Sequence, residues 1–215
     1  MPDLWIVVTD PHRPGHELKY HPPGETNFRA ADVIIINKID TANRDDIQKV
    51  REDIEKVNPN AIVIDGASPL YVDKPELIKG KRVLVVEDGP TLTHGGMRYG
   101  AGYIAAKKYG GAKEIVDPRP YAVGSIVDTY RKYSHLDVIL PAMGYGAKQI
   151  KELEETINRA DADVVIMGTP IDLRRIMKLN KPAVRVRYEL EEIGEPKLKD
   201  VLRDFVEKCE KLKKE

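Results

Sequence analysis

Short, unbroken runs of Val, Ile and Leu recur along this chain and alternate with segments of helical periodicity. Runs of this kind are typical of strands that are buried on both faces of a parallel sheet. Strands are therefore expected near residues 4–9, 32–36, 61–65, 82–87, 114–117, 137–140, 163–167 and 183–188. The alternation predicts an α/β fold with a mainly parallel sheet and flanking helices.

Three helices can be placed between and after these strands from their apolar spacing. Asn43 is expected to cap the helix that carries Ile47, Val50 and Ile54, because an Asn side chain satisfies free N–H groups at a helix start. A second apolar stripe occupies positions 150, 153 and 157. The last helix carries Leu198, Val201, Leu202, Phe205, Cys209 and Leu212. All three stripes are expected to face the core, which makes Cys209 a packed thiol.

Composition narrows the classes of partner. The 215 residues contain 35 Lys and Arg against 35 Asp and Glu, so the net charge is zero. Such a balance argues against nucleic acid or an anionic membrane surface as a partner, and any anion site must be local. The lone Cys, the lack of a leader segment and the lack of a long apolar run predict a soluble, cytoplasmic protein. A charged content of 33% with two Gln is typical of thermophile proteins.

The tetrapeptide Asn37-Lys38-Ile39-Asp40 follows an expected strand and precedes the helix capped by Asn43. It matches the Asn-Lys-x-Asp element with which GTPases bind the base. The Asp40 carboxylate can accept two N–H groups of guanine, and the aliphatic stem of Lys38 can cover the base. Ser68 lies where GTPases carry a Ser-Ala loop, although the order here is Ala-Ser. The alternative is an ordinary polar loop between strand and helix.

Asp10 ends the first expected strand, in the position of an acid that holds Mg²⁺ beside a nucleotide. Its alternative role is to cap the turn before Pro11. No Gly-x-x-x-x-Gly-Lys-Ser/Thr occurs in the sequence, so the loop that would cradle the β and γ phosphates is missing. The loop after Asp10 is rich in His, and we expect His12 and Arg13 to contact substrate or phosphate rather than zinc.

Loops after the strands of the second half predict an anion site. One is glycine-rich and contains His94, Gly95, Gly96 and Arg98 before an expected helix, where backbone N–H groups could meet an anion. Arg119 and the pair Arg174-Arg175 follow two other strands. If the strands are parallel, these cationic side chains converge on one rim, where they could bind a phosphorylated substrate. Equally, the loops could be mere connections and the arginines a solvated face.

Several of these segments together resemble the archaeal cyclic 2,3-diphosphoglycerate synthetase family and its relatives, the predicted GTPases. The resemblance rests on residues 10–17, 37–40, 87–97, 117–120 and 168–173. It implies a P-loop protein of about twice this length that uses ATP or GTP with Mg²⁺ to transfer a phosphoryl group within a phosphorylated small molecule. Residues 1–80 would then complete a P-loop-type nucleotide-binding domain, and residues 81–215 would form a Rossmann-like domain.

The sequence thus predicts the carboxyl-terminal portion of a nucleotide-dependent ligase, inactive alone. The base would be bound by Asn37, Lys38, Asp40 and Ser68, and Mg²⁺ by Asp10. The substrate would be bound by His12, Arg13, Gly95, Gly96 and Arg98, and transfer assisted by His94, Arg119, Arg174 and Arg175. The alternatives are a GTP-binding regulatory module or GTPase without synthesis, and a degenerate fold that acts through another chain. ATP versus GTP and homo-oligomer formation stay open.

Overall fold

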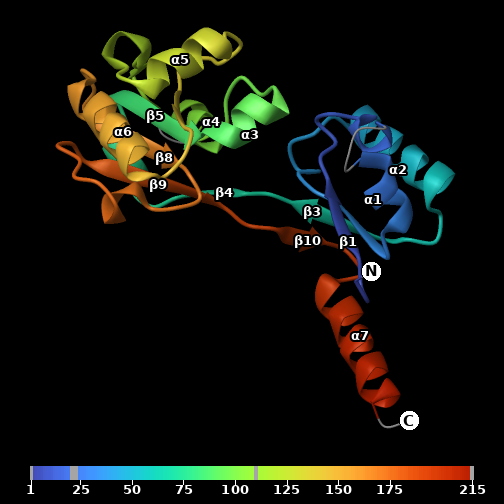
Figure 1. Cartoon of the computed structure of the whole chain (residues 1–215). Helices are drawn as coiled ribbons and strands as arrows, with labels where there is room; N and C mark the ends of the chain where they lie inside the picture. The colour runs from blue at the N-terminus through green and yellow to red at the C-terminus, as the bar shows by residue number, and fades with distance from the viewer. Residues whose placement is uncertain (1, 20–23, 109–110, 214–215) are drawn as a thin grey trace. The chain divides into compact units, whose positions relative to one another are not determined.

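The computed structural model describes residues 2–19, 24–108 and 111–213, and the chain divides into two compact units (Figure 1). Unit 1 combines Met1–Pro69 with Glu189–Glu215, and unit 2 is Leu70–Tyr188. The chain therefore leaves unit 1 once and returns to it once. Each unit is an α/β body with its own sheet and core.

The sheet of unit 1 has the strand order β1-β2-β3-β10. Strands β1 (Ile6–Thr9), β2 (Val33–Ile36) and β3 (Ile62–Ala67) are parallel to one another. The short strand β10 (Glu191–Ile193) runs antiparallel to β3. Three carboxyl ends consequently lie side by side at one edge of this sheet, and the residues that follow them form one group of loops.

Alternation along β2 explains how unit 1 is layered. Ile34 and Ile36 pack with Phe28 on helix α1 (Gly24–Ala30) and with Val50 on helix α2 (Arg44–Val57). Val33 and Ile35 point to the other face, because successive side chains of a strand alternate. There they meet Leu198 and Val201, at the start of helix α7 (Leu198–Leu212). Asn43 caps α2 as expected, since its side chain accepts a hydrogen bond from Asp45 N.

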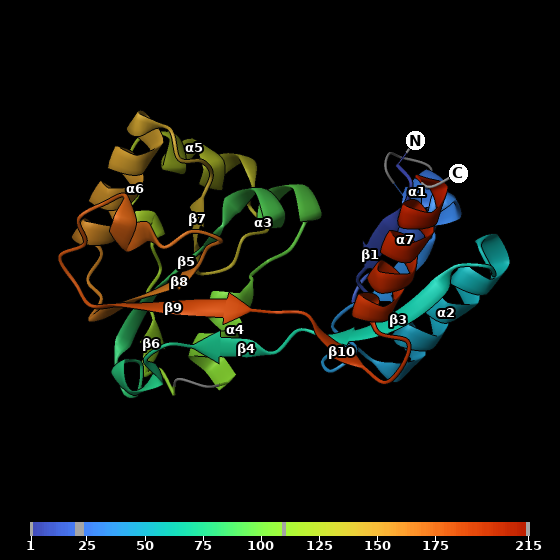
Figure 2. The same ribbon diagram turned by 90° about the horizontal axis from the view of Figure 1, so that it is seen from below.

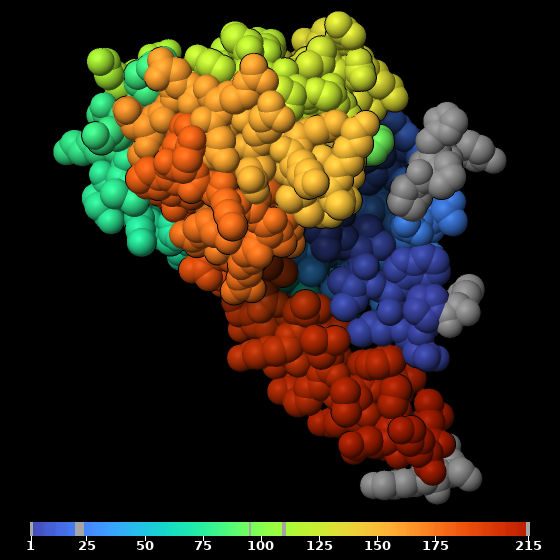
Figure 3. Space-filling model, turned by 60° about the vertical axis from the view of Figure 1, so that its left-hand side comes forward, coloured from blue at the N-terminus to red at the C-terminus, as the bar shows by residue number. Residues whose placement is uncertain are grey.

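Helix α7 corrects one expectation. Its apolar stripe was expected to lie in the core, but no residue of α7 is fully buried. Leu202 and Leu212 are 42% and 63% exposed, and the residues of α7 that pack on the apolar cluster of this face, Leu198 and Val201, lie in its first turn. Figure 3 shows the outer part of α7, in red, with much of its surface uncovered on that side. The periodicity correctly indicated an amphipathic helix, but did not indicate how much of it the unit covers.

Unit 2 contains a six-stranded sheet with the order β4-β9-β8-β5-β6, in which β7 also pairs with β5 (Figure 2). The strands are β4 (Leu70–Val72), β5 (Arg82–Asp88), β6 (Glu114–Ile115), β7 (Leu140–Ala142), β8 (Val164–Gly168) and β9 (Ala183–Tyr188). All pairings are parallel except that of β4 with β9. The two central strands, β5 and β8, supply most of the buried apolar side chains.

Helices cover both faces of this sheet. Val83 and Val85 of β5 pack against helix α4 (Ala101–Lys108), whereas Leu84 and Val86 pack against the opposite layer. That layer consists of helices α5 (Ser125–Lys132) and α6 (Ala147–Arg159). Helix α3 (Gly89–Gly95) follows β5 directly. Short 3-10 turns complete the structure: η1 (His16–Leu18), η2 (Pro75–Leu77), η3 (Arg119–Tyr121) and η4 (Leu173–Arg175).

These layers confirm the predicted α/β fold, with mostly parallel sheets and flanking helices. Each of the eight expected strands overlaps an observed one, and β4 and β10 are additional. The observed units differ from the expected domains 1–80 and 81–215. The reason is that β10 pairs with β3 and the first turn of α7 packs on that sheet, which returns the end of the chain to unit 1. Among the described helices, none combines the length and apolar composition needed to cross a bilayer.

Candidate nucleotide site

Three polar segments follow β1, β2 and β3, and the structure links them through hydrogen bonds. Asp40, after β2, accepts a hydrogen bond from the backbone N–H of Ser68, with 3.1 Å between Oδ1 and N. Ile39 N donates to the carbonyl of Gly66 at 3.1 Å. Asp40 itself is exposed. Its carboxylate is thus oriented by the loop after β3, and a carboxylate has further lone pairs with which to accept N–H groups of a base.

Asp10 joins the loop after β1 to the loop after β2. Its Oδ2 lies 2.6 Å from Lys38 Nζ, and its Oδ1 lies 2.9 Å from His12 Nδ1. Partial burial acts to raise the pKa of Asp10, but the hydrogen bonds from Lys38 and His12 outweigh it and leave the pKa lowered. Asp10 is therefore ionised at neutral pH. The ion pair thus joins the loop after β2 to the loop after β1.

Lys38 has a backbone φ of 61°, in the left-handed region that residues other than Gly rarely adopt. Such strain at a loop between strand and helix is characteristic of functional sites. Its neighbour Asn37 has a buried side-chain oxygen, Oδ1, without a hydrogen-bond donor among the described residues. A buried acceptor without a partner is costly, and the hydrogen-bonding capacity of this oxygen is unmet within the described residues.

The predicted Mg²⁺ role of Asp10 can be compared with its surroundings. Both of its oxygens are already engaged, one by an ammonium group and one by an imidazole. Within the described residues, no group of three or more His, Cys, Asp or Glu side chains is arranged to hold a metal ion. These donors do not form a ready site for a cation that prefers several oxygen ligands. The Mg²⁺ role of Asp10 stays a prediction.

Residues that sequence reasoning missed support this edge of the sheet. Arg51 of α2 donates from Nη2 to both oxygens of Asp65, at 2.7 and 2.6 Å, and so ties α2 to β3. Glu17 of η1 and Asp53 of α2 are buried acids that face each other. Burial raises the pKa of Glu17, and the nearby Asp53 raises it further. The sequence signal for this buried pair was the position of an acid, Asp53, among the regularly spaced apolar residues of α2.

In unit 2, a side-chain carboxyl group of the protein occupies the space beside the glycine-rich loop. Glu87, at the end of β5, is 2% exposed. Its Oε1 accepts hydrogen bonds from Gly100 N at 3.2 Å and from Tyr103 N at 2.9 Å, at the start of α4. A Cβ built on Gly100 or Gly168 would lie within 3.0 Å of the Glu87 carboxyl group. Burial raises the pKa of Glu87 to about 7, despite the backbone donors.

Gly95 and Gly96 do precede α4, but they lie at the carboxyl end of α3 and not at the start of α4. Gly95 ends α3, and Gly96 caps its carboxyl end with a φ of 64°. That end of a helix presents carbonyl groups rather than N–H groups, so the local backbone does not favour an anion. The helix that does receive an anion is α4, whose first N–H groups bind Glu87. His94 is exposed on the last turn of α3.

The predicted cationic rim is only partly assembled. Arg98 and Arg119 come together at Asp137: Arg98 Nη2 lies 3.4 Å from its carboxylate, and Arg119 Nη2 donates to its carbonyl at 3.3 Å. Arg119 also pairs with Asp117 at 3.0 Å. These contacts lie on the side of β5 that carries β6 and β7.

In unit 1, the predicted substrate residue Arg13 is half-buried. Its backbone N–H donates to the carbonyl of Asp10 at 3.1 Å.

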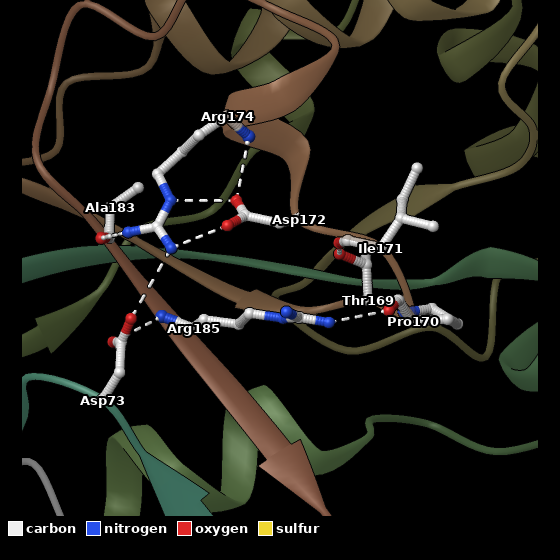
Figure 4. A network of polar contacts seen from close by, with 8 residues as sticks. All are labelled: Asp73, Thr169, Pro170, Ile171, Asp172, Arg174, Ala183 and Arg185. Atoms are coloured by element: carbon white, nitrogen blue, oxygen red, sulfur yellow. Dashed lines mark hydrogen bonds and ion pairs between the residues drawn. The ribbon is translucent and has the colours of Figure 1, made fainter.

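Arg174 lies at the opposite edge of the sheet, with β8 and β5 between it and the first group. It forms a bidentate ion pair with Asp172, at 2.9 and 2.8 Å, and donates to the carbonyl of Ala183 at the start of β9 (Figure 4). Asp73 lies 3.6 Å away and also accepts from Arg185 N. Arg175 is exposed on the same turn, η4. The structure thus does not gather the four predicted residues at one rim.

Two comparisons with known proteins bear on these sites. Residues 2–65 match the family model described as the CobW/HypB/UreG nucleotide-binding domain. The chain is also 86% identical over 213 residues to a protein named arginine synthetase ArcE, from Thermococcus kodakarensis. The match covers 99% of this chain and 47% of that protein, so the chain spans about half the length of this curated relative.

These findings confirm the prediction of a nucleotide-binding domain in the first part of the chain. The finer resemblance to cyclic 2,3-diphosphoglycerate synthetases is not tested by them and stays a prediction. The matched segment contains Asp10, Lys38 and Asp40, which the structure connects through hydrogen bonds across three strand ends. Residues 2–65 are similar to CobW/HypB/UreG nucleotide-binding domains, and nearly the whole chain is similar to half of a named arginine synthetase.

Proposed function

We propose that this chain is the nucleotide-base-binding part of a nucleotide-dependent synthetase whose product is arginine. One observation carries the nucleotide half of the proposal: Asp40 and Lys38 follow one strand and are oriented by Ser68 and Asp10 from the two neighbouring strands. The arginine half is supported by the 86% identity to the named arginine synthetase.

The binding scheme assigns separate tasks to these side chains. Asp40 accepts the N–H groups on the edge of a guanine, which adenine does not present as a matching pair. Lys38, held by Asp10, covers one face of the base with its aliphatic stem. The orphaned Asn37 Oδ1 accepts from a donor that arrives with the nucleotide or with its phosphate-binding loop. These roles favour GTP over ATP, and any Mg²⁺ would accompany the phosphates.

The resemblance to cyclic 2,3-diphosphoglycerate synthetases suggests a different substrate, a polyanion held by His94, Arg98, Arg119, Arg174 and Arg175. The geometry supports this substrate less well. Arg119 and Arg174 are both paired with carboxylates and lie on opposite sides of the sheet. We therefore retain phosphoryl transfer by a ligase as the reaction class and propose arginine as the product.

Substitution of Asp40 tests the base-binding half. Asp40→Asn replaces one acceptor oxygen by a donor, and GTP affinity should fall about 100-fold, because one hydrogen bond is lost and the other loses its charged acceptor. ATP affinity should change less than about threefold. Competition against a fluorescent guanine nucleotide gives both values. Asp45→Asn, on the exposed first turn of α2, is the matched control and should leave both unchanged.

Calorimetry with L-arginine tests the other half, since a synthetase binds its product. The measurement uses a protein of the full length of the arginine synthetase that the chain matches. Saturable binding of L-arginine that L-lysine does not reproduce supports the proposal. Guanine preference without any arginine binding would instead identify a nucleotide-responsive regulatory module. No nucleotide binding by that longer protein would refute the base-binding assignment itself.

A further inference from the structure

A concavity of about 540 Å³ opens on unit 2, beside the edge formed by β4 and β9. Its walls come from two segments, one around η2 and one that connects η4 to β9. Four cationic side chains line it: Lys74, Arg174, Lys178 and Lys181. The remaining lining is apolar or aliphatic and includes Leu77 and Met177. We call it the lysine concavity.

No carboxylate is among the residues that line the lysine concavity, all of which are described. This composition is notable in a chain whose charges balance to zero. Acids lie just outside this lining. Asp172 and Asp73 pair with Arg174 (Figure 4), and Glu154 accepts a hydrogen bond from Lys178 N at 2.8 Å. Asp161, which pairs with Arg82, lies near Lys181. Arg174 is neutralised by its bidentate ion pair with Asp172, so the positive charges that line the concavity and remain for a ligand are those of its three lysines. Like charges gathered in a concave surface focus the potential and attract an oppositely charged ligand.

The side chain of Lys181 is held in place by two hydrogen bonds. Its Nζ donates to Asn158 O at 3.0 Å and to Asn180 Oδ1 at 2.8 Å. An ammonium group has three N–H donors, so this geometry uses two and leaves a third for a ligand. Burial lowers the pKa of Lys181, which means that its charged form lacks full compensation. Lys74 and Lys178 are exposed and can move toward a ligand.

We propose that the lysine concavity binds the phosphate group of a small organic phosphate, with Lys74, Lys178 and Lys181 around the phosphate and Leu77 and Met177 against the organic part. A doubly charged group matches three lysines better than a single carboxylate does. The planar fork of Arg174, which suits carboxylates, is already occupied by Asp172. The site lies wholly in unit 2 and shares no residue with the base site at Asn37–Asp40.

The test measures binding of inorganic pyrophosphate to the chain by calorimetry, with citrate as the carboxylate comparison. The variant Lys74→Ala/Lys178→Ala removes two exposed charges and should weaken pyrophosphate binding at least about tenfold. The control, Lys113→Ala/Lys132→Ala, removes two charges beside β6 and α5, on the other side of the sheet. It should leave binding within about twofold.

Three results would overturn the proposal: no binding of pyrophosphate, an equal loss in the control variant, or tighter binding of citrate than of pyrophosphate. A fourth measurement separates this site from the base site. Asp40→Asn should leave pyrophosphate binding unchanged, and loss of it there would place the anion at the nucleotide site and refute the concavity. Melting temperatures of both double variants should match the parent, because the lysines removed are exposed.

Discussion

The two units place carboxylates at the carboxyl ends of parallel strands but use them in opposite ways. In unit 1, Asp10 and Asp40 bind groups from neighbouring loops, and Asp40 stays exposed. In unit 2, Glu87 is buried and occupies the start of α4. One edge therefore keeps an exposed carboxylate, whereas at the other a buried carboxyl group of the protein fills the space at the start of α4. A glycine-rich loop between strand and helix does not by itself predict a bound phosphate.

The largest expected effect concerns the pH dependence of unit 2. The pKa of Glu87 is about 7 in the folded chain against a usual value of 4.5. The folded state thus holds its proton more tightly than the unfolded state, so this group makes stability fall as pH rises from about 4.5 to about 7. The loss is about 3 kcal/mol over that window and is complete above it. Glu87→Gln, which cannot ionise, should abolish this slope.

Hydrogen exchange of β5 and α4, measured from pH 4.5 to 8 and corrected for intrinsic rates, gives the stability of unit 2 without interference from unit 1. A suitable control is Glu114→Gln, because Glu114 is exposed on β6. Retention of the slope in Glu87→Gln would show that the carboxylate of Glu87 is not its source, and would remove the contrast between the two units.

A smaller effect is expected from relief of backbone strain in unit 1. Lys38→Gly should increase the free energy of unfolding by up to about 1 kcal/mol, because glycine adopts the left-handed conformation without strain. Loss of the ion pair with Asp10 offsets part of this gain. Guanine-nucleotide affinity should fall about tenfold, because the aliphatic cover is lost. Chemical denaturation followed through Trp5, together with nucleotide titration, measures both. Unchanged affinity would show that Lys38 has only a structural role.

The smallest effect is expected for Asn43→Ala, which removes the cap of α2. Unit 1 should lose about 1 kcal/mol, since the N–H of Asp45 loses its acceptor. Asn43→Ser keeps an acceptor and should recover most of this loss. Nucleotide affinity should stay within about twofold in both variants, because the cap supports the helix rather than the loop. A larger loss of affinity would mean that α2 positions Asp40 directly.

The sequence predicted those features that depend on local pattern. Unbroken apolar runs located eight strands, and the position of Asp40 after such a run located the base site. Strands β4 and β10 were missed because three-residue edge strands leave almost no periodic signal. The contact between Arg174 and Asp73 could not be predicted either. It depends on the pairing of β4 with β9, which joins segments more than a hundred residues apart.

The structural role of Glu87 could not be predicted from the sequence, for a physical reason. An acid between an apolar run and a glycine-rich loop reads equally well as a ligand-binding group and as a buried anchor. Only the closeness of Gly100 and Gly168 to its carboxyl group shows that the space around it is already filled. The exposed part of α7 has a similar explanation, since an amphipathic stripe does not reveal what it packs against.

The return of the chain from unit 2 to unit 1 makes unit 2 an insertion within unit 1. Leu70 and Tyr188, the first and last residues of unit 2, are paired across β4 and β9. The two ends of the folded insertion therefore lie side by side, as the ends of a hairpin loop do. Because of this, the pairing of β3 with β10 costs little conformational entropy. Unfolding of unit 2 would turn about 120 residues into an open loop, and closing such a loop costs about 4 kcal/mol. The nucleotide-binding sheet thus depends on the folding of a segment that contributes no strand to it.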